Sequence, residues 1–424
     1  MEAIEVMKEE FLCYIWENRL LKGRLATTDG VEIEIVNAGY RNSNSGPDFL
    51  EAQIRIGTTL WAGNVEIHVK TSDWNRHQHQ QDKAYGNVVL HVVYEHDSAT
   101  PDLPTLVLNG HFDESLYDEY QSFIHAKGWI PCEKSVASVQ TFTWLSWLDR
   151  MVAERLERKA VSVVKLLNAN KNDWEDAFYK LMLHYLGLKV NNEAFEYLSS
   201  ILSYRTLQKH SDNLLQVEAM LFGCAGLLDR DFTDEYPLLL QREFAAMKAK
   251  FGLLTMPAER WKFMRMRPGN FPTLRLSQIA QIVHRSGNLF SKIKEAESVE
   301  ALRALFDVPA SGYWNTHYRF ESVSRSRPKH LGETTSDVLI VNAIVPLLFC
   351  YGRQHGTPSV CERAIGFLEN TPAEDNTVTR HYAACGVAAR NAMQSQAMLH
   401  LFECYCKRRQ CLKCRIGSLL IKNG

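Results

Sequence analysis

Four residues in the N-terminal part of this chain have the types and spacing that metal-dependent hydrolysis requires. In the segment VEIHVK, Glu66, His68 and Lys70 alternate with apolar residues, so a β-strand would place all three on one face. Asp48 stands in the preceding GPDF segment, where a hairpin would bring it beside Glu66. Two adjacent carboxylates suit Mg²⁺ or Mn²⁺, and a nearby lysine or histidine would activate a water molecule.

The same pattern also has a purely structural interpretation. A polar row backed by valine and isoleucine is typical of a sheet with one solvated face. In that case Glu66, His68 and Lys70 would have no chemical role. The sequence alone leaves both interpretations open.

Further polar residues follow the strand in WNRHQHQQDKAYG, residues 74–86. His77 and His79, with Asp82, would stand at the start of a helix, where they would contact phosphate or a second metal ion; surface histidines are the alternative. His91 lies within the apolar run NVVLHVVY. We expect it to be a hydrogen-bonded histidine of the core.

The periodicity of residues 1–130 predicts one helix, three strands, a second helix and a fourth strand. Leu12, Ile15, Trp16 and Leu20 recur at helical spacing, with Glu9 on the same face. The strand-like runs, rich in β-branched residues and separated by turn residues, cover 31–39, 52–57, 60–70 and 87–95. The second helix would cover 74–86. This order predicts an α+β domain.

This order of elements and residues resembles the PD-(D/E)xK nuclease superfamily. The positions that match its motifs are Glu9 on the first helix, Pro47-Asp48 before the second strand and Glu66-Ile67-His68 on the third. The sequence departs from the pattern at His68, where the family has lysine. Gln81 and Tyr85 have the spacing of the Gln-xxx-Tyr motif on the second helix of RecB-like members.

The resemblance implies a divalent-metal-dependent nuclease or nuclease-like phosphodiesterase that acts on nucleic acid. Asp48 and Glu66 would hold Mg²⁺ or Mn²⁺, Glu9 would support them, and His68 or Lys70 would activate water. The substrate would contact His77, His79, Gln81 and Tyr85. The alternative is an inactive nuclease fold that serves as a nucleic-acid-binding or scaffold module.

The whole chain resembles, more closely, an uncharacterised bacterial family of unknown function. Its hallmark is a run of GPDF, W-x-GNVEIH, SDW-x-x-H-x-H-x-x-D and LHVV motifs. The residues of this chain that fit these motifs are Asp48, Glu66, His68, Asp73, Trp74, His77, His79, Asp82 and His91. This second resemblance implies no activity.

After about residue 140 the pattern becomes helical, as in TWLSWLDRMVAERLERKAVSVVKLL. We therefore expect a nuclease-fold domain over 1–130, a helical domain over 131–395 and a basic cysteine-rich tail over 396–424. Residues 1–130 hold 10 Lys and Arg against 20 Asp and Glu, and the remaining residues hold 38 against 29. Such asymmetry suggests a cation-binding part and a polyanion-binding part, although two complementary domain faces would give the same counts.

The tail LFECYCKRRQCLKCRIG has cysteines at metal-binding spacing. Cys406, Cys411 and Cys414 would bind Zn²⁺, with Cys404 or a distant residue as the fourth ligand. The resemblance to RecB-like nucleases adds an iron–sulfur cluster as a possibility, and reduced, packed cysteines are the structural alternative. The cations between them would neutralise phosphates: Lys407, Arg408, Arg409, Lys413 and Arg415.

A second basic segment, RMRPGNFPTLR, contains Arg265, Arg267 and Arg275. It would contact a phosphate or a stacked base of the substrate. Alternatively, these residues cap and join two helices. Walker A, Rossmann, GxSxG and HExxH motifs are absent from the sequence, which excludes the corresponding enzyme classes.

The sequence also bears on the compartment. The first residues, MEAIEVMKEEFLCYIW, lack the pattern of a signal peptide. The longest apolar run, 338–352, contains Asn342 and Pro346 and is shorter than a bilayer requires, so it predicts a buried helix. We expect a cytoplasmic protein without a membrane partner, and the oligomeric state stays open.

Overall fold

The computed structural model describes residues 7–42, 44–98 and 103–423. The chain forms two compact units, each with its own contacts. The sheet unit comprises the chain up to Trp144 together with Phe402–Gly424, and the helical unit comprises Leu145–Leu401. A sheet-containing N-terminal region followed by a mainly helical region is therefore confirmed. The segment after Phe402, which the sequence set apart as a tail, packs within the sheet unit.

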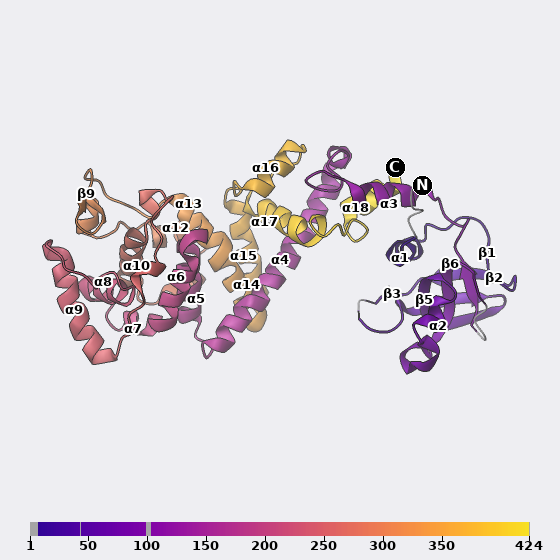
Figure 1. Ribbon diagram of the computed structural model, residues 1–424, viewed down its shortest axis with the longest axis horizontal. Helices are drawn as coiled ribbons and strands as arrows, with labels where there is room; N and C mark the ends of the chain where they lie inside the picture. Colours follow the sequence, from indigo (N-terminus) through magenta and orange to yellow (C-terminus); the bar gives the residue numbers. More distant parts are fainter. Residues whose placement is uncertain (1–6, 43, 99–102, 424) are drawn as a thin grey trace. The chain divides into compact units, whose positions relative to one another are not determined.

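The sheet unit is built on a mixed sheet with the order β1-β2-β4-β5-β6-β7, in which β3 pairs with β4 (Figure 1). The pairs among β1, β2, β3, β4 and β5 are antiparallel, whereas β6 is parallel to β5 and β7 is parallel to β6. The strands are β1 (Leu25–Ala26), β2 (Glu32–Asn37), β3 (Tyr40–Arg41), β4 (Phe49–Ile56), β5 (Thr59–Lys70), β6 (Val88–Glu95) and β7 (Thr105–Val107).

The first helix, α1 (Glu9–Glu17), supplies much of the core beside β5. All residues from Phe11 to Trp16 are buried, and the indole N–H of Trp16 donates a hydrogen bond to the carbonyl of Ala38 at 3.0 Å. Glu9 stands in the first turn of the helix, where a negative charge is favoured by the helix dipole. The helix thus brings a carboxylate to the side of the sheet.

Two β-bulges flank the motif-bearing part of β5. On β4 the register shifts between Phe49 and Ala52, and Glu51 has a φ of 58°. On the other side the register of β5 with β6 shifts next to Asn64. A Cβ on Gly63 would meet Val89 Cγ1 at 2.3 Å, so this position requires glycine. Bulges of this kind re-aim side chains, and here they set which residues of β4 and β6 lie beside Glu66.

The second helix predicted over 74–86 is wrong in its extent. A short helix α2 (Asp73–Arg76) is followed by two single 3₁₀ turns, η1 (His79–Gln81) and η2 (Lys83–Tyr85). Gln78 adopts a left-handed conformation with φ 61°, and Asp82 is extended while its carboxylate accepts from Ala84 N–H. Both conformations end a helix. Gln81 and Tyr85 consequently lie in different turns and do not share a helix face.

The C-terminal segment completes the sheet unit. Helix α18 (Arg415–Asn423) packs beside α3 (Ser115–His125), and the hydroxyl of Tyr14 on α1 contacts Ser418 at 3.1 Å. The ring of Trp129 stacks on Phe402 with centroids 4.4 Å apart. Contacts between residues some 400 positions apart therefore hold the last helix to the first.

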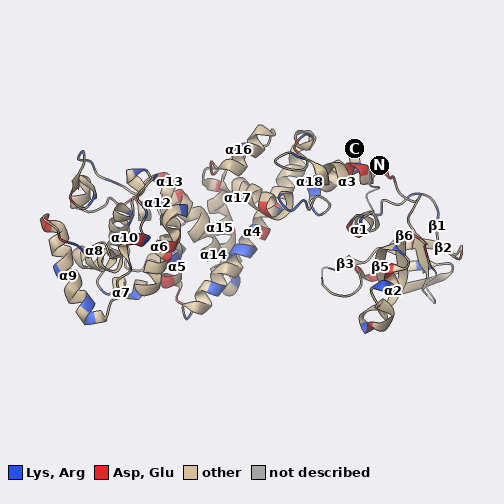
Figure 2. Ribbon diagram, in the orientation of Figure 1, with Lys and Arg blue, Asp and Glu red and all other residues tan. Residues whose placement is uncertain are grey.

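This arrangement reduces the charge asymmetry seen in the sequence. The sheet unit with its C-terminal segment holds 17 Lys and Arg against 22 Asp and Glu, and the helical unit holds 31 against 27. Both signs of charge occur in each unit (Figure 2). The division into an acidic and a basic part is thus weaker in the folded protein than along the sequence.

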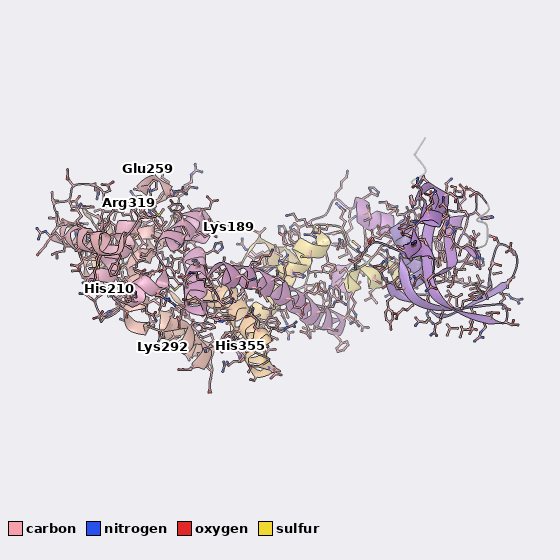
Figure 3. The ribbon with its side chains drawn as sticks, turned by 90° about the horizontal axis from the view of Figure 1, so that it is seen from below. Lys189, His210, Glu259, Lys292, Arg319 and His355 are labelled. Atoms are coloured by element: carbon pink, nitrogen blue, oxygen red, sulfur yellow. The ribbon has the colours of Figure 1, made fainter. Side chains whose placement is uncertain are left out.

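The helical unit consists of helices, short 3₁₀ turns and a small hairpin of β8 (His317–Arg319) with β9 (Ser322–Val323). Exposed charged side chains such as Lys189, Glu259 and Lys292 are spread around its surface (Figure 3). Its helices are α4 (Thr141–Ala169), which begins in the sheet unit, α5 (Trp174–Leu186), α6 (Leu188–Ile201), α7 (Tyr204–Gln208), α8 (Leu214–Cys224), α9 (Glu235–Phe251), α10 (Pro272–Ser286), α11 (Leu289–Glu295), α12 (Val299–Phe306), α13 (Glu333–Leu339), α14 (Val345–Gln354), α15 (Pro358–Asn370), α16 (Thr377–Ala384) and α17 (Ala392–Leu401).

In the described part of the chain, one continuous helical segment is long and apolar enough to cross a membrane, Glu333–Gln354, and 72% of its apolar window is buried. It joins α13 to α14 through a π-helical turn, Ile340–Ile344. Pro346 lacks the N–H that an α-helix would direct to Asn342, which accounts for the wider turn before it. Its burial is that of a core helix of the helical unit.

Candidate functional site

Two hydrogen bonds join Asp48 to Glu66 and to the next residue of β5, Ile67. The backbone N–H of Asp48 donates to Glu66 Oε2 at 3.0 Å, and the backbone N–H of Ile67 donates to Asp48 Oδ2 at 3.1 Å. The bulge at Glu51 makes this possible, because it pairs Phe49 with Val65 and so sets Asp48 beside Glu66. The two predicted metal ligands therefore lie side by side.

Two imidazoles, of His68 and His79, face the remaining oxygen of Glu66, and a third, of His77, lies against His68. Its Oε1 lies 3.4 Å from His68 Nε2 and 3.3 Å from His79 Nε2, and His77 Nδ1 lies 3.2 Å from His68 Nε2. One ligand atom from each of His68, His77 and His79 lies within 4.8 Å of the others. Within residues 7–42, 44–98 and 103–423, this is the one group of three or more His, Cys, Asp or Glu with metal-binding geometry.

His91 forms a second layer behind this group. Parallel pairing of β5 with β6 sets it opposite Glu66, and its Nε2 lies 2.9 Å from His68 Nδ1. The side chain is fully buried, as expected of a core histidine. Its partner could not be read from the sequence, because the bulge in β6 decides which residue faces His68.

Aromatic rings enclose the imidazoles. The ring of Tyr85 stacks on His79 with centroids 3.8 Å apart, and Trp74 contacts the rings of both His79 and His91. The polar crossover between β5 and β6 thus folds back over the sheet. The spacing of SDW-x-x-H-x-H was the sequence signal for this group of residues. No sequence pattern indicated the turns that bring their rings into contact.

The electrostatics of the site follow from crowding several acidic groups in a poorly hydrated place. Burial, followed by the charge of Asp48, raises the pKa of Glu66 to about 8. Burial also raises the pKa of Asp48, against the opposing charge of Arg41. Glu9 is exposed at the surface, and partial desolvation, followed by the charges of Asp48 and Asp73, raises its pKa to about 7. Such carboxyls favour a nearby cation.

The imidazoles respond in the opposite direction. Burial, and then the neighbouring histidines, lower the pKa of His68 to about 2, and burial lowers that of His91 to about 4. Both rings are therefore neutral at pH 7. Neutral imidazole is the form that binds metal ions.

Lys70, the other residue predicted to activate water, is engaged elsewhere. Its ammonium lies 3.2 Å from Glu95 Oε2, directly across from it on β6, and its side chain is 44% exposed. The strand thus has a buried imidazole at position 68 and a surface ion pair at position 70.

An open hollow of about 600 Å³ adjoins the site. It is lined by His77, Gln78, Gln81, Asp82 and Lys83. His77 and Gln81 are exposed, whereas Glu66 and His68 are 5% and 1% exposed. The hollow is therefore the side from which a solute would reach the buried groups.

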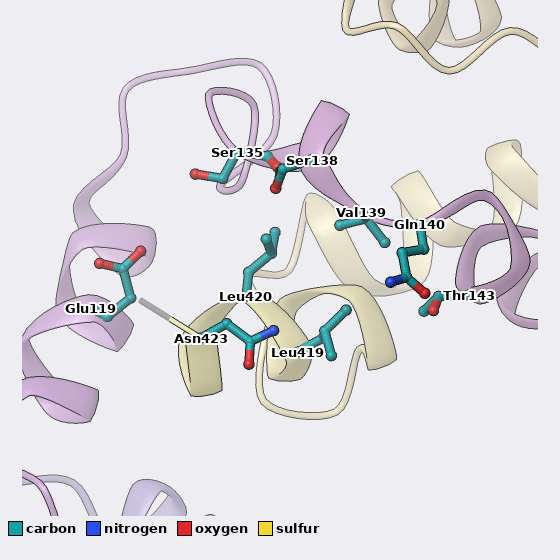
Figure 4. Close-up of a pocket in the computed structure, with 9 residues that line it drawn as sticks. All are labelled: Glu119, Ser135, Ser138, Val139, Gln140, Thr143, Leu419, Leu420 and Asn423. Carbon is teal, nitrogen blue, oxygen red and sulfur yellow. Dashed lines mark hydrogen bonds between the residues drawn. The ribbon is translucent and has the colours of Figure 1, made fainter.

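A second pocket of about 420 Å³ lies between α3 and α18 (Figure 4). Of its lining residues, Glu119 alone carries an ionisable side chain. The others are Ser135, Ser138, Val139, Gln140, Thr143, Leu419, Leu420 and Asn423. This composition gives no basis for catalysis.

The three arginines of RMRPGNFPTLR belong to the helical unit and differ in environment. Arg265 and Arg267 are exposed, the former with φ 59°. Arg275 is 3% exposed, and it donates to Gln278 Oε1 at 2.9 Å, to Asn270 Oδ1 at 2.7 Å and to Thr335 Oγ1. Burial lowers its pKa to about 10. Arg275 therefore joins α10 to its neighbours, which agrees with the structural alternative for this residue.

In the part of the chain that the structure describes, no group of three metal-binding side chains includes Cys404, Cys406, Cys411 or Cys414. Cys411 and Cys414 are buried, and burial raises the pKa of the Cys411 thiol to about 12. Binding of Zn²⁺ or an iron–sulfur cluster here stays a prediction without geometric support.

The comparisons place this chain in a family. The family described as "Protein of unknown function (DUF2851)" matches residues 9–377, and the chain belongs to it. The match spans both the site described above and most of the helical unit. No curated protein and no solved structure matches.

Proposed function

We propose that this protein is a divalent-metal-dependent phosphodiesterase that acts on nucleic acid, with its site in the sheet unit. The observation that carries the proposal is the pairing of Asp48 with the Glu66-Ile67 segment, in which Asp48 N–H donates to the Glu66 carboxylate and Ile67 N–H donates to the Asp48 carboxylate. Helix α1, the antiparallel strands β2, β4 and β5, a crossover and the parallel strand β6 follow one another along the chain, an order that supports the resemblance to the PD-(D/E)xK core. The short strands β1 and β3 and the shortened second helix are departures from that core.

The residues present fit a bound cation. Each of the two carboxylates has one oxygen committed to a backbone N–H, and Glu66 Oε1 is left facing imidazole nitrogens. Asp48 and Glu66 would hold the ion, as the resemblance implies, with a histidine adding a nitrogen ligand. A mixed nitrogen and oxygen set suits Mn²⁺ better than Mg²⁺, which prefers oxygen. When bound, the ion would supply Lewis-acid stabilisation of charge on the phosphoryl oxygens.

Other residues would handle the proton and the substrate. Glu9, whose pKa is raised to about 7, is matched to accept a proton from an attacking water near neutral pH. His68 is buried and neutral, so it is better suited to orientation than to proton transfer. Lys83, in the open hollow beside His77, would contact a phosphate oxygen.

The test is cleavage of end-labelled single- and double-stranded DNA and RNA by the full chain with Mn²⁺ or Mg²⁺. Asp48→Asn and Glu66→Gln should each reduce the rate by 100-fold or more, on the order of the loss of one essential electrostatic group. Glu34→Gln is the matched control, because Glu34 forms an exposed ion pair with Arg55 on the same sheet. Cleavage that is equal in all four proteins, or absent with every substrate and ion, would refute the proposal.

One observation favours the alternative, a nuclease fold that binds nucleic acid without cutting it. Where the PD-(D/E)xK pattern has lysine, this chain has His68, which is buried and neutral. Lys70 on the same strand is paired with Glu95. This alternative predicts salt-dependent binding without turnover, weakened by Arg408→Glu and Arg265→Glu, which change exposed cations. Binding that does not depend on salt would count against it.

A further inference from the structure

We propose that His68, His77, His79 and Glu66 form a binding site for a transition-metal ion of the Zn²⁺ type. The inference concerns the site of the proposed function, and any catalytic role of the ion rests on that function. Metal binding itself can be measured without an activity assay. It differs from the expected Mg²⁺ or Mn²⁺ site on Asp48 and Glu66 in its ligands and its metal. Three of the four ligands are imidazoles.

The distances between the donor atoms fit a tetrahedral ion. Bonds of about 2.0–2.1 Å to nitrogen or oxygen place neighbouring ligands of a tetrahedron about 3.3 Å apart. The observed separations are 3.4 Å for His68 Nε2 to Glu66 Oε1, 3.3 Å for His79 Nε2 to Glu66 Oε1 and 3.2 Å for His77 Nδ1 to His68 Nε2. These three separations match neighbouring ligands of one tetrahedral ion. Glu66 lies outside the group of three imidazoles whose ligand atoms are all within 4.8 Å of one another, so its carboxylate would have to move toward His77 to complete the set.

One of the donor atoms lacks a hydrogen-bond partner that would explain its position. His79 Nε2 is buried and, among the described residues, has no hydrogen-bond partner, although it faces the carboxylate of Glu66. If His68 donates its Nδ1–H to His91, its Nε2 presents a lone pair toward both His77 Nδ1 at 3.2 Å and the acceptor Glu66 Oε1 at 3.4 Å. Acceptors that face one another in a buried place are unfavourable unless a cation lies between them.

The surroundings resemble the support that protein metal sites have. A metal-binding imidazole usually donates its second ring nitrogen to an acceptor, which fixes the tautomer and ring orientation. His91 Nε2 holds this position behind His68 at 2.9 Å, and Tyr85 stacks on His79. His77 is exposed at the open hollow, so an ion and then a solute can enter from that side.

The composition of the set selects the metal. Three imidazoles and one carboxylate suit Zn²⁺, Fe²⁺ or Ni²⁺, whereas Mg²⁺ requires oxygen ligands in near-octahedral geometry. The geometry therefore points to a first-row transition metal that would be retained when Mg²⁺ is in excess.

Co²⁺ provides the direct probe, because a tetrahedral nitrogen and oxygen site gives it visible absorption bands. The full chain is stripped with a chelator and titrated with Co²⁺ in the presence of millimolar Mg²⁺, and bound Co²⁺ is then displaced by Zn²⁺. Wild type should bind one ion per chain. His77→Gln and His79→Gln should bind at least tenfold more weakly. His111→Gln, on a half-buried histidine whose Nδ1 lies 3.1 Å from the Lys22 carbonyl oxygen, should bind as wild type does.

The outcomes separate this inference from the proposed function. Stoichiometric Co²⁺ binding without nucleic-acid cleavage would support the metal site and refute the nuclease. Cleavage with Mg²⁺ that persists in His77→Gln, in a protein that binds no Co²⁺, would support the nuclease and refute the metal site. Absence of Co²⁺ bands in a folded wild-type protein, or equal affinity in the histidine variants, would mean that shared protons hold the imidazoles together, and would overturn the inference. Circular dichroism of each variant confirms folding.

Discussion

The backbone N–H of Asp48 donates a hydrogen bond to Glu66 Oε2 at 3.0 Å, which joins two acidic residues across neighbouring strands of the sheet. The pairing depends on one extra residue in β4, at the bulge that contains Glu51. Without that residue the strand would present its opposite face at this point. The site is thus a product of strand register as much as of residue type.

Gly63 should be essential to this register. Its replacement by valine would push a Cβ to 2.3 Å from Val89 Cγ1 and 2.7 Å from the Asn87 carbonyl, so β5 and β6 would have to separate. We expect Gly63→Val to destabilise the sheet unit by about 1–3 kcal/mol, as overpacking does. Denaturant unfolding measures the change. Gly366→Ala, where a Cβ meets nothing within 4 Å, serves as control, and equal stability of both variants would contradict the assigned role.

His91 should support the metal ion through His68. Replacing the buried His91 with leucine removes the acceptor 2.9 Å from His68 Nδ1 and keeps an apolar side chain in the core. Loss of such support typically weakens metal affinity 10–100-fold. Competition between Co²⁺ and a chelator measures the affinity. A His91→Leu protein that is folded and binds Co²⁺ as tightly as wild type would show that His91 only fills space.

Arg409 should stabilise the fold and contribute little to binding of a polyanion. Its guanidinium donates to the carbonyls of Phe123, Ile124 and Ala126 at the C-terminus of α3, over 2.5–2.9 Å. A cation at a helix C-terminus is favoured by the helix dipole. We expect Arg409→Ala to cost about 1 kcal/mol of unfolding free energy.

The matched control for that change is Arg408→Ala, because Arg408 is exposed and adjacent. It should leave the unfolding free energy nearly unchanged. If the two alanine variants unfold at the same denaturant concentration, the capping role assigned to Arg409 is wrong.

Lys159 should make the stability of the helical unit depend on pH. Burial, and then the charges of Arg155 and Arg158, lower its pKa to about 7, and its Nζ donates to Asn342 Oδ1 at 2.9 Å. Above pH 7 the folded protein holds a neutral amine, whereas the unfolded chain keeps its proton until about pH 10.5. Stability should therefore rise with pH between these values.

Unfolding midpoints at pH 6.5 and pH 9 test this expectation. In Lys159→Met, the part of the increase in stability with pH that comes from the Lys159 amine should disappear. In Lys165→Met, at an exposed position of the same helix, the increase should persist. The same pH dependence in wild type and both variants would contradict the assignment.

The strands of the sheet unit could be predicted because alternation is a local property. The runs at 52–57, 60–70 and 87–95 correspond closely to β4, β5 and β6. The crossover could not be predicted in this way. Gln78 adopts a left-handed backbone without being glycine, and Asp82 ends one turn and begins another, so a polar segment that resembled a helix folds as separate turns.

The site was predicted only in part for the same reason. Alternation was enough to bring Glu66 and His68 to one face, and the GPDF segment was enough to suggest Asp48. The contacts of His77 with His68 and of His79 with Glu66 depend on the turns of the crossover. The link from His68 to His91 depends on a bulge. Such features arise from tertiary packing, and residue spacing does not encode them.

The most direct test of the account is a crystal of the full chain soaked with Zn²⁺, with anomalous diffraction recorded on both sides of the zinc absorption edge. The account predicts one strong peak bounded by His68 Nε2, His77, His79 Nε2 and Glu66 Oε1, at about 2.0–2.2 Å from its ligands. A map without a peak among these four side chains, with Zn²⁺ found elsewhere or not at all, would contradict it.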